Sequence, residues 1–179
     1  MSNIEPQAVE ALLDAAFGTD RFGRTAYRIR EGVDAVPALS FALVEDSALI
    51  ATIQCWPVVH RKADGAETPL VMVGPVAVRP DVQRGGHGRT LMAHMLAASE
   101  TKADGALMMI GDPEYYDRFF GFSARHTQGW TLPGPVDRDR VLARLRPGQT
   151  VLVRFGPGPK GLMAAEVRPD GGPLNFAAH

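Results

Sequence analysis

Cysteine is almost absent from this chain of 179 residues, in which Cys55 is the single one. One cysteine excludes an intrachain disulfide and a metal site built from several thiolates. An excess of charge of either sign is also missing, because 19 basic residues balance 20 acidic ones. Since nucleic-acid binding requires a basic footprint, we expect no nucleic-acid partner.

Long hydrophobic runs are missing as well. No stretch reaches the roughly 20 apolar residues that cross a bilayer, and the first residues lack the basic-then-apolar plan of a secretory signal. We therefore expect a soluble, cytoplasmic protein without a membrane partner. The chain is long enough for one domain with a substantial core.

Hydrophobic periodicity and turn residues predict the elements of the first half of the chain. Apolar positions spaced as on one helix face predict a helix over residues 6–17 and a short second helix over 24–30. Two strand patterns follow, over 39–45 and 48–57, and Asp46-Ser47 would join them as a hairpin. The chain therefore begins with two helices and continues into a sheet.

A third strand is predicted over residues 70–78, where nearly every position is apolar. Such a pattern is typical of a central strand covered on both faces. Pro75 lies inside it, and proline occurs in sheets at edges or bulges because it cannot donate to the ladder. We expect a bulge at Gly74-Pro75; an ordinary kink of the strand is the alternative.

The most informative stretch is residues 74–92, where this strand runs into a glycine-rich turn and then an amphipathic helix. The first amides of a helix have no partner inside it, so they form a binding site for an anion such as a pyrophosphate. Arg84 and Arg89 add positive charge, and the glycines of residues 85–88 let a ligand approach the backbone closely. The turn therefore predicts a phosphate cradle.

The spacing of the glycines narrows the choice of ligand. A nucleotide P-loop needs a lysine after its glycines, which is missing here, and a dinucleotide fingerprint needs a third glycine where Leu91 stands. The pattern Gln-x-x-Gly-x-Gly is satisfied by Gln83, Gly86 and Gly88. With the preceding strand, it resembles the pyrophosphate-binding motif of the GNAT superfamily of acetyl-coenzyme A-dependent acyltransferases.

Residues 106–122 support the same resemblance. They read as a strand followed by a helix with an aromatic-Tyr-x-x-x-Gly-Phe signature, and the Gly-Asp-Pro-x-Tyr-Tyr opening is similar to a bacterial branch of the superfamily. The resemblance extends over roughly residues 8–125 in layout. Because both motifs occur in order, separated by one helix and one strand, we identify the chain as resembling this superfamily.

The resemblance implies an α/β (α+β) fold with a mixed, mostly antiparallel sheet, helices on both faces and splayed central strands. It implies an acyltransferase core over residues 1–125. Residues 126–179 would be a carboxyl-terminal extension packed on the same domain. Within the extension we expect a helix over 137–145 and strands near 150–155 and 162–167.

The resemblance further implies acetyl-coenzyme A as co-substrate and no metal. The backbone of Val76 and Val78 would contact the pantetheine arm between the splayed strands. The predicted cradle consists of Arg84, Gly85, Gly86, His87, Gly88 and Arg89. Because the superfamily uses backbone groups here, we expect the His87 side chain to be exposed.

Tyr116 is the implied acid that protonates the leaving thiolate, since a phenol of pKa about 10 is protonated at neutral pH. Packing against the ligand or core is the alternative role. Counting back from Gly121-Phe122 would instead put Asp117 in the tyrosine position. Asp112 is expected to cap the helix.

Several other polar residues are assigned no catalytic role. The general base is left open, because the acids near the strand ends are read as solvated loop charges: Glu45, Asp46 and Glu67. Cys55 is expected to be a buried thiol. The basic residues at helical spacing are expected to face solvent: Arg24, Arg28 and Arg30.

These observations predict an N-acetyltransferase that transfers the acetyl group to a primary amine, on a small molecule or a protein, by direct attack in a ternary complex. A non-catalytic acyl-coenzyme A sensor or partner-binding module is the alternative. A nucleotide-phosphate enzyme fits poorly, because the cradle lacks a lysine. The protein is expected to be a monomer or a homodimer.

Overall fold

The computed structural model describes residues 4–61, 64–103 and 105–146. Its five strands form one sheet in the order β1-β2-β3-β4-β5. They are β1 (Phe41–Glu45), β2 (Ala48–Arg61), β3 (Glu67–Val78), β4 (Ala106–Ile110) and β5 (Val141–Arg144). The pairs β1–β2 and β4–β5 are antiparallel and β3–β4 is parallel, so the sheet is mixed.

The α-helices are α1 (Pro6–Phe17), α2 (Thr25–Ile29), α3 (His87–Lys102) and α4 (Pro113–Phe120). Short 3-10 segments join the elements: η1 (Thr19–Gly23), η2 (Pro37–Leu39), η3 (Pro80–Gly85), η4 (Ala124–Thr127) and η5 (Arg138–Arg140). This arrangement confirms the predicted α/β class with a mixed, mostly antiparallel sheet. No helix in the described ranges is long and apolar enough to cross a membrane.

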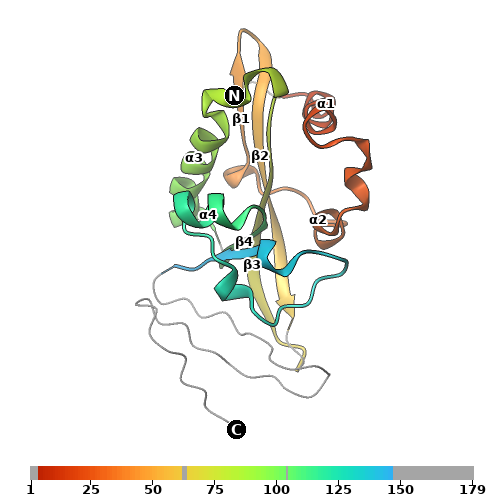
Figure 1. Ribbon diagram of the computed structural model, residues 1–179, viewed down its shortest axis with the longest axis vertical. Coiled ribbons are helices and arrows are strands. Elements are labelled where there is room, and N and C mark those ends of the chain that lie inside the picture. The colour runs from red at the N-terminus through yellow and green to blue at the C-terminus, as the bar shows by residue number, and fades with distance from the viewer. Residues whose placement is uncertain (1–3, 62–63, 104, 147–179) are drawn as a thin grey trace. The chain divides into compact units, whose positions relative to one another are not determined.

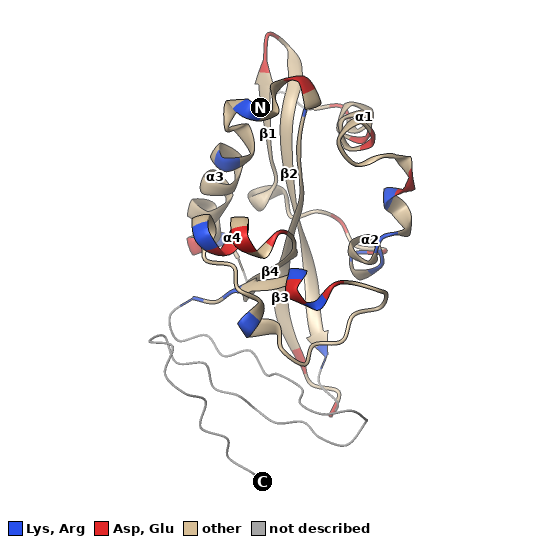
Figure 2. Cartoon of the chain, viewed as in Figure 1, with Lys and Arg blue, Asp and Glu red and all other residues tan. Residues whose placement is uncertain are grey.

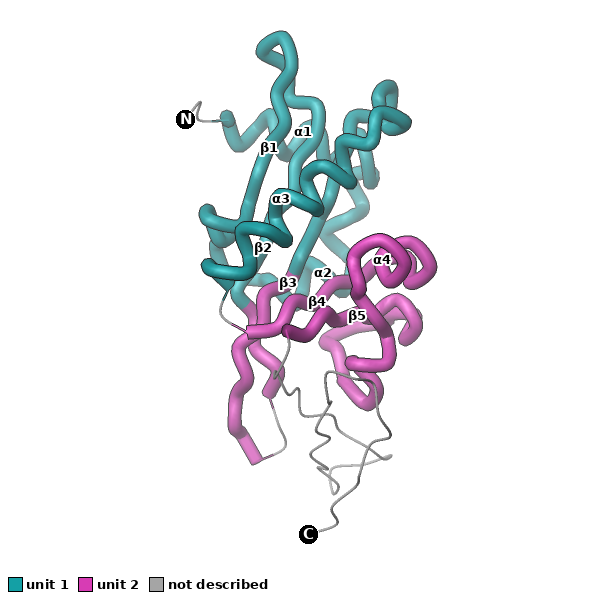
Figure 3. Tube along the Cα trace, turned by 90° about the vertical axis from the view of Figure 1, so that its left-hand side faces the viewer, with its two compact units in different colours: residues 1–57, 73–103 teal, residues 58–72, 104–179 magenta. Residues whose placement is uncertain are grey.

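The chain divides into two compact units (Figure 3). The first unit comprises residues 1–57 and 73–103, and the second comprises residues 58–72 and 104–179. The first unit thus contains α1, α2 and α3 with the end of β3. The second contains β4, α4 and β5. Charges of both signs occur along α3 and along α4 (Figure 2).

In the first unit, α1 and α2 lie on one side of β1 and β2, and α3 lies on the other (Figure 1). Leu12 and Leu13 of α1 form a buried cluster with Ala77 of β3. The apolar face of the predicted amphipathic helix α3 is buried at Leu91, Met92 and Met95. Helices thus cover both faces of this part of the sheet, as predicted.

The first hairpin confirms the predicted turn between β1 and β2. Asp46 and Ser47 have φ values of 48° and 65°, which suits a two-residue turn that matches the twist of the strands. The predicted bounds were less accurate. Leu39 ends η2 rather than beginning a strand, because Pro37 opens a 3-10 turn, and β2 continues beyond the predicted end to Arg61.

The parallel ladder between β3 and β4 is short. It joins Leu70–Met72 to Ala106–Met108, whereas β3 itself runs on to Val78. A ladder of this length is what a splayed pair of strands would leave. Pro75 lies within β3, and Gly74 before it has a φ of 119°, a conformation that favours glycine.

The second unit corrects one prediction. Residues 137–145 do not form a helix, because η5 occupies only Arg138–Arg140 and the chain then enters β5. The apolar residues Val141, Leu142 and Ala143 are buried as β5 pairs with β4, so sheet pairing prevails over helical spacing here. The strands predicted near 150–155 and 162–167 lie outside the described residues.

Candidate functional site

The predicted cradle forms the link between β3 and α3. Residues 80–85 form η3, and Gly86 is the N-cap of α3 in the left-handed conformation, with φ 75° and ψ 7°. No side chain caps this helix end, and the first hydrogen bond back to Gly86 comes from the amide of Thr90 at 3.1 Å. The amides of His87 and Gly88, which open α3, therefore have no acceptor within the helix and can bind an external one.

The end of β3 has a second set of available amides. The amide of Arg79 donates to the carbonyl of Ile50 in β2 at 2.9 Å. Because backbone groups alternate between the two edges of a strand, the amide of Ala77 also faces β2. The amides of Val76 and Val78 consequently face the opposite edge of β3. An extended ligand lying along that edge would find two donors.

Gly88 brings the cradle and this strand together. A Cβ added at Gly88 would lie 3.5 Å from Cγ2 of Val78 and 3.8 Å from Cγ1 of Val76. The first turn of α3 thus packs directly on the residues whose amides face the free edge of β3. Nothing lies within 4 Å of the corresponding position at Gly86, so that backbone is open to a ligand.

The charged members of the cradle lie at its surface. Arg84 and Arg89 are both exposed, as are Gly85 and Gly86. The prediction for His87 was wrong, since the side chain is half-buried. Its ring folds back over Gly85, where an added Cβ would lie 2.9 Å from the imidazole Cδ2.

Tyr116 belongs to the second unit, on α4. Its ring is half-buried and covers Gly111, where an added Cβ would lie 2.6 Å from Cδ2 of the ring. Gly111 is in turn fixed by Arg140, because the Gly111 amide donates to the Arg140 carbonyl at 2.9 Å and the Arg140 Nε donates to the Gly111 carbonyl at 3.3 Å. A glycine at the end of β4 thus makes room for the phenol.

Burial raises the pKa of Tyr116 to about 12, with further contributions from Tyr115 and Asp112, while Arg140 acts in the opposite direction. The phenol therefore keeps its proton throughout the physiological range and can act as a hydrogen-bond donor. Asp117 is exposed, whereas Tyr116 is half-buried.

The structure confirms that Asp112 is the N-cap of α4. Its Oδ1 accepts hydrogen bonds from the amides of Glu114 at 3.0 Å and Tyr115 at 3.4 Å. Cys55 is fully buried, which confirms the prediction of a buried thiol, and burial raises the pKa of that thiol to about 12. Glu67 accepts two hydrogen bonds from Arg61.

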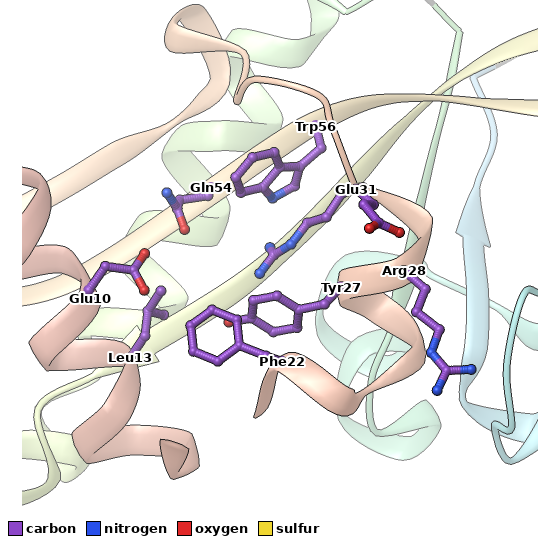
Figure 4. Close-up of a pocket in the computed structure, with 9 residues that line it drawn as sticks. Glu10, Leu13, Phe22, Tyr27, Arg28, Glu31, Gln54 and Trp56 are labelled. Carbon is purple, nitrogen blue, oxygen red and sulfur yellow. The ribbon is translucent and has the colours of Figure 1, made fainter. Parts of the chain in front are cut away.

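Sequence reasoning missed a pocket of about 520 Å³ in the first unit. Glu10 and Leu13 of α1, Phe22 and Tyr27 of the η1–α2 segment, and Gln54 and Trp56 of β2 line it (Figure 4). Arg28, Arg30 and Glu31 complete the lining. The pocket is thus aromatic on several sides and contains charges of both signs.

The prediction that the basic residues near α2 face solvent was wrong for Arg30, which is 7% exposed. Its guanidinium carbon lies 4.0 Å from the centre of the Tyr27 ring and 4.4 Å from that of the Trp56 ring. Its Nη1 donates to the Gly74 carbonyl at 3.1 Å, and the Trp56 Nε1 donates to the same oxygen at 2.7 Å. Burial lowers the pKa of Arg30. The aromatic residues at 27 and 56 were the signal in the sequence.

Arg21 is also buried, with 1% exposure, but it has acidic partners. Its guanidinium donates to Glu10 at 2.5 Å, to Asp14 at 2.9 Å and to the Tyr27 hydroxyl at 2.5 Å. Burial alone would lower the pKa of Arg21, but these hydrogen bonds outweigh it and the pKa is raised. Arg21 therefore fastens η1 and α2 to α1 beside the pocket.

Among the described residues, no cluster of three or more His, Cys, Asp or Glu side chains could hold a metal ion.

The residues at the α3 cradle fit the pyrophosphate and pantetheine parts of coenzyme A. The helix N-terminus is uncapped, Gly86 leaves its backbone open, and two strand amides face the free edge of β3 next to Gly88.

Two solved structures of similar fold contain coenzyme A or acetyl-coenzyme A. YhbS from Escherichia coli, a GNAT family N-acetyltransferase solved with coenzyme A, is 24% identical, with a TM-score of 0.59 and coverage of 78% of this chain and 74% of that chain. A GNAT family acetyltransferase from Brucella melitensis, solved with acetyl-coenzyme A, is 27% identical, with a TM-score of 0.52 and coverage of 78% and 91%.

A search of curated proteins found no match. A family model does match: the acetyltransferase (GNAT) family model aligns with residues 7–122. This range includes both motifs identified in the sequence, the cradle of α3 and the tyrosine helix α4. The chain therefore belongs to the acetyltransferase (GNAT) family.

Proposed function

We propose that this protein is an N-acetyltransferase that transfers the acetyl group of acetyl-coenzyme A to a primary amine by direct attack in a ternary complex. One observation carries the proposal. The uncapped first turn of α3 packs through Gly88 on Val76 and Val78, whose amides face the free edge of β3. A phosphate-binding helix end and an arm-binding strand edge are thus adjacent.

The cradle would hold the pyrophosphate by the backbone amides of residues 85–88, with Arg84 and Arg89 supplying charge at the surface. The amides of Val76 and Val78 would hold the pantetheine arm like an added strand. When bound, acetyl-coenzyme A supplies an acyl group activated as a thioester. The protein's own contribution is to fix that group and to exclude alternative positions for the amine.

Tyr116 is proposed to donate a hydrogen bond to the departing thiolate. Its pKa of about 12 exceeds that of an ordinary thiol, about 8.5, so full proton transfer would be uphill by about 5 kcal/mol. The phenol is therefore better suited to stabilise the thiolate by a hydrogen bond than to give up its proton completely. Asp117, which the alternative count favoured, is exposed, whereas Tyr116 is half-buried against Gly111, so we assign the role to Tyr116.

The attacking amine must lose a proton, and no side chain is assigned this task. Glu67 is occupied by Arg61 at an exposed position, and Glu45 and Asp46 are exposed at the hairpin. We propose that water accepts the proton. This assignment predicts a rate that rises with pH until the amine itself is deprotonated.

Gly88 offers a direct test of the binding site. Alanine fits there at 3.5 Å from Val78, whereas leucine would fill the space between α3 and the edge of β3. Gly88→Leu should weaken coenzyme A binding by about 10- to 100-fold, as expected from the loss of charge-assisted hydrogen bonds, while Gly88→Ala binds nearly normally. Calorimetric titration measures both, and thermal unfolding confirms that both variants are folded.

Thiol release from acetyl-coenzyme A across a panel of primary amines tests the chemistry. Amine-dependent release supports the enzyme, and Gly88→Leu should abolish it at cofactor concentrations that saturate the wild type. Wild-type affinity for coenzyme A in Gly88→Leu would contradict the proposed site.

The alternative function is a non-catalytic acyl-coenzyme A sensor or partner-binding module. The raised pKa of Tyr116, which makes it a poor acid, is the observation that favours it. A sensor would bind the cofactor in the titration yet never release its thiol with any amine.

We further propose that the chain belongs to the branch with the Gly-Asp-Pro-x-Tyr-Tyr motif and that it is a monomer or a homodimer. We also propose that it divides into a core over 1–125 and an extension over 126–179.

A further inference from the structure

We propose that the pocket of the first unit binds the acceptor through a carboxylate, with Arg30 as the anchor. The acceptor would then be a primary amine that also carries a carboxylate on an apolar or aromatic body. This inference rests on the proposed acetyltransferase function and names the class of acceptor. It assigns to Arg30 a specificity role in binding, with no part in the bond changes.

Arg30 carries a buried positive charge that is paired with no carboxylate of the described residues. Arg30 is 7% exposed, and none of the ion pairs within the described ranges joins it to a carboxylate. A buried charge is costly unless an opposite charge compensates it. Arg21, close to it in the chain, shows the usual solution, since two carboxylates bind its guanidinium. Within the described ranges Arg30 thus has the Gly74 carbonyl and two aromatic rings as partners but no bonded carboxylate, which suits it to bind the carboxylate of a ligand.

Two acidic residues line the same pocket as Arg30. Glu10 also lines the pocket, but its carboxylate binds Arg21 at 2.5 Å. Glu31, the other acid of the lining, is exposed. The positive charge of Arg30 is thus buried in the pocket, whereas Glu10 and Glu31 lie nearer to solvent. A zwitterionic ligand matches this distribution of charge, with its carboxylate at Arg30 and its polar end toward the acids.

Aromatic rings surround the Arg30 guanidinium in the pocket. The rings of Tyr27 and Trp56 lie over it, at 4.0 Å and 4.4 Å from its central carbon, and both residues face the pocket (Figure 4). One N–H of the guanidinium already donates to the Gly74 carbonyl, so a ligand would bind at the remaining N–H groups along its edge. A planar carboxylate pairs edge-on with a guanidinium through two parallel hydrogen bonds. Rings lying over the guanidinium favour a planar carboxylate in the plane of its N–H groups over a tetrahedral phosphate.

The pocket is connected to β3, the strand proposed to hold the cofactor. Arg30 and Trp56 both donate to the carbonyl of Gly74, which precedes Val76 by two residues in β3. The proposed acceptor anchor is thus hydrogen-bonded to the strand proposed to hold the pantetheine arm. In the transfer itself, the amine nitrogen bonds to the acyl carbon as the carbon–sulfur bond breaks. The proton of the amine passes to water, and the departing thiolate is stabilised by a hydrogen bond before it takes a proton from solvent.

The test compares acids with their amides, which keep the amine and the body but lose the carboxylate. Three pairs vary the body: phenylalanine and phenylalaninamide, leucine and leucinamide, alanine and alaninamide. Calorimetry measures the Kd of each with the wild-type chain, and thiol release measures kcat/KM with acetyl-coenzyme A. For at least one pair, we expect the acid to bind about 10- to 100-fold more tightly than the amide, as expected for a charged hydrogen-bonded pair.

Arg30→Gln should reduce the ratio of amide Kd to acid Kd to about one. Arg30→Lys, which keeps the charge but not the fork, should retain part of the preference and provides a measurement if the glutamine variant does not fold. Arg61→Gln is the matched control, because Arg61 is an exposed arginine paired with Glu67, and its ratio should equal that of the wild type.

The outcomes separate this inference from the proposed function. Equal affinity for every acid and its amide in the wild type, no binding of any acid, or an unchanged ratio in Arg30→Gln overturns the inference. Acetylation of acids and amides at equal kcat/KM, together with equal affinity, leaves the acetyltransferase standing and removes the anchor. Binding of acids through Arg30 without thiol release from any amine retains the anchor and removes the proposed function.

Discussion

Gly111→Ala should disable Tyr116 without touching it. The added methyl carbon would lie 2.6 Å from Cδ2 and 2.7 Å from Cε2 of the Tyr116 ring. Carbon atoms pack at about 3.5–4.0 Å, so the ring must retreat by about 1 Å. The backbone at Gly111 does not have a positive φ, so alanine is accepted there and only the ring has to move.

A displacement of 1 Å from a productive position lowers a rate by as much as about 100-fold. We therefore expect kcat to fall by about 10- to 100-fold in Gly111→Ala, as it should in Tyr116→Phe. Coenzyme A affinity should be nearly unchanged in both, because the proposed cofactor contacts lie in β3 and the α3 cradle. Steady-state thiol release and calorimetry provide the two readouts. Gly23→Ala is the control, because an added Cβ there meets nothing within 4 Å.

The double variant decides whether the two changes act on the same group. If Gly111→Ala works by moving the hydroxyl, it should have little further effect in a Tyr116→Phe background. Losses that multiply in the double variant would show that Gly111→Ala acts by another route. Wild-type turnover in Tyr116→Phe would remove the hydroxyl from the mechanism altogether.

Three further predictions concern stability. Arg21→Met removes the hydrogen bonds that join η1 and α2 to α1 and should lower the free energy of unfolding by about 2–4 kcal/mol; a urea midpoint equal to wild type contradicts this. Gly105→Ala would place a Cβ 2.8 Å from the Pro69 carbonyl carbon at a φ of 94°, so thermal unfolding should show a loss of more than about 3 kcal/mol. The pKa of Tyr116 is raised to about 12 in the folded chain, against about 10 when unfolded, so the protonated phenol stabilises the folded state. This stabilisation is fully present below about pH 10 and is lost as the pH rises towards 12, which lowers the free energy of unfolding by about 2–3 kcal/mol at most. Urea titrations at pH 9.5 and 11.5 should show this loss in the wild type and not in Tyr116→Phe.

The cradle could be predicted from the sequence because its determinants are local. A left-handed N-cap requires glycine at position 86, and close packing of α3 on β3 requires a small residue at position 88. The same holds for Asp112, whose capping partners lie two and three residues away. Helix ends and tight turns are set by neighbouring residues, so a single sequence contains the information.

The buried arginines could not be predicted in this way. Arg24, Arg28 and Arg30 look alike at helical spacing, yet only Arg30 among them is buried. The difference arises from Trp56, 26 positions later in the chain, which covers the guanidinium. Likewise, β5 is a strand because β4 pairs with it, and no local pattern in residues 141–144 specifies that partner. Contacts between distant segments override local propensity.

The division of the chain into two units gives the proposal a specific logic. The α3 cradle, the amides of Val76 and Val78, and the Arg30 pocket all belong to the first unit, whereas Tyr116 belongs to the second. Binding of both substrates should therefore depend on residues of the first unit, and the chemical step on a residue of the second. An enzyme and a sensor would share the binding properties of the first unit, and they would differ in whether bound acetyl-coenzyme A releases its thiol to an amine. For this reason thiol release, and not cofactor titration, distinguishes catalysis from binding, and variants of Tyr116 and Gly111 test whether the phenol contributes to that release.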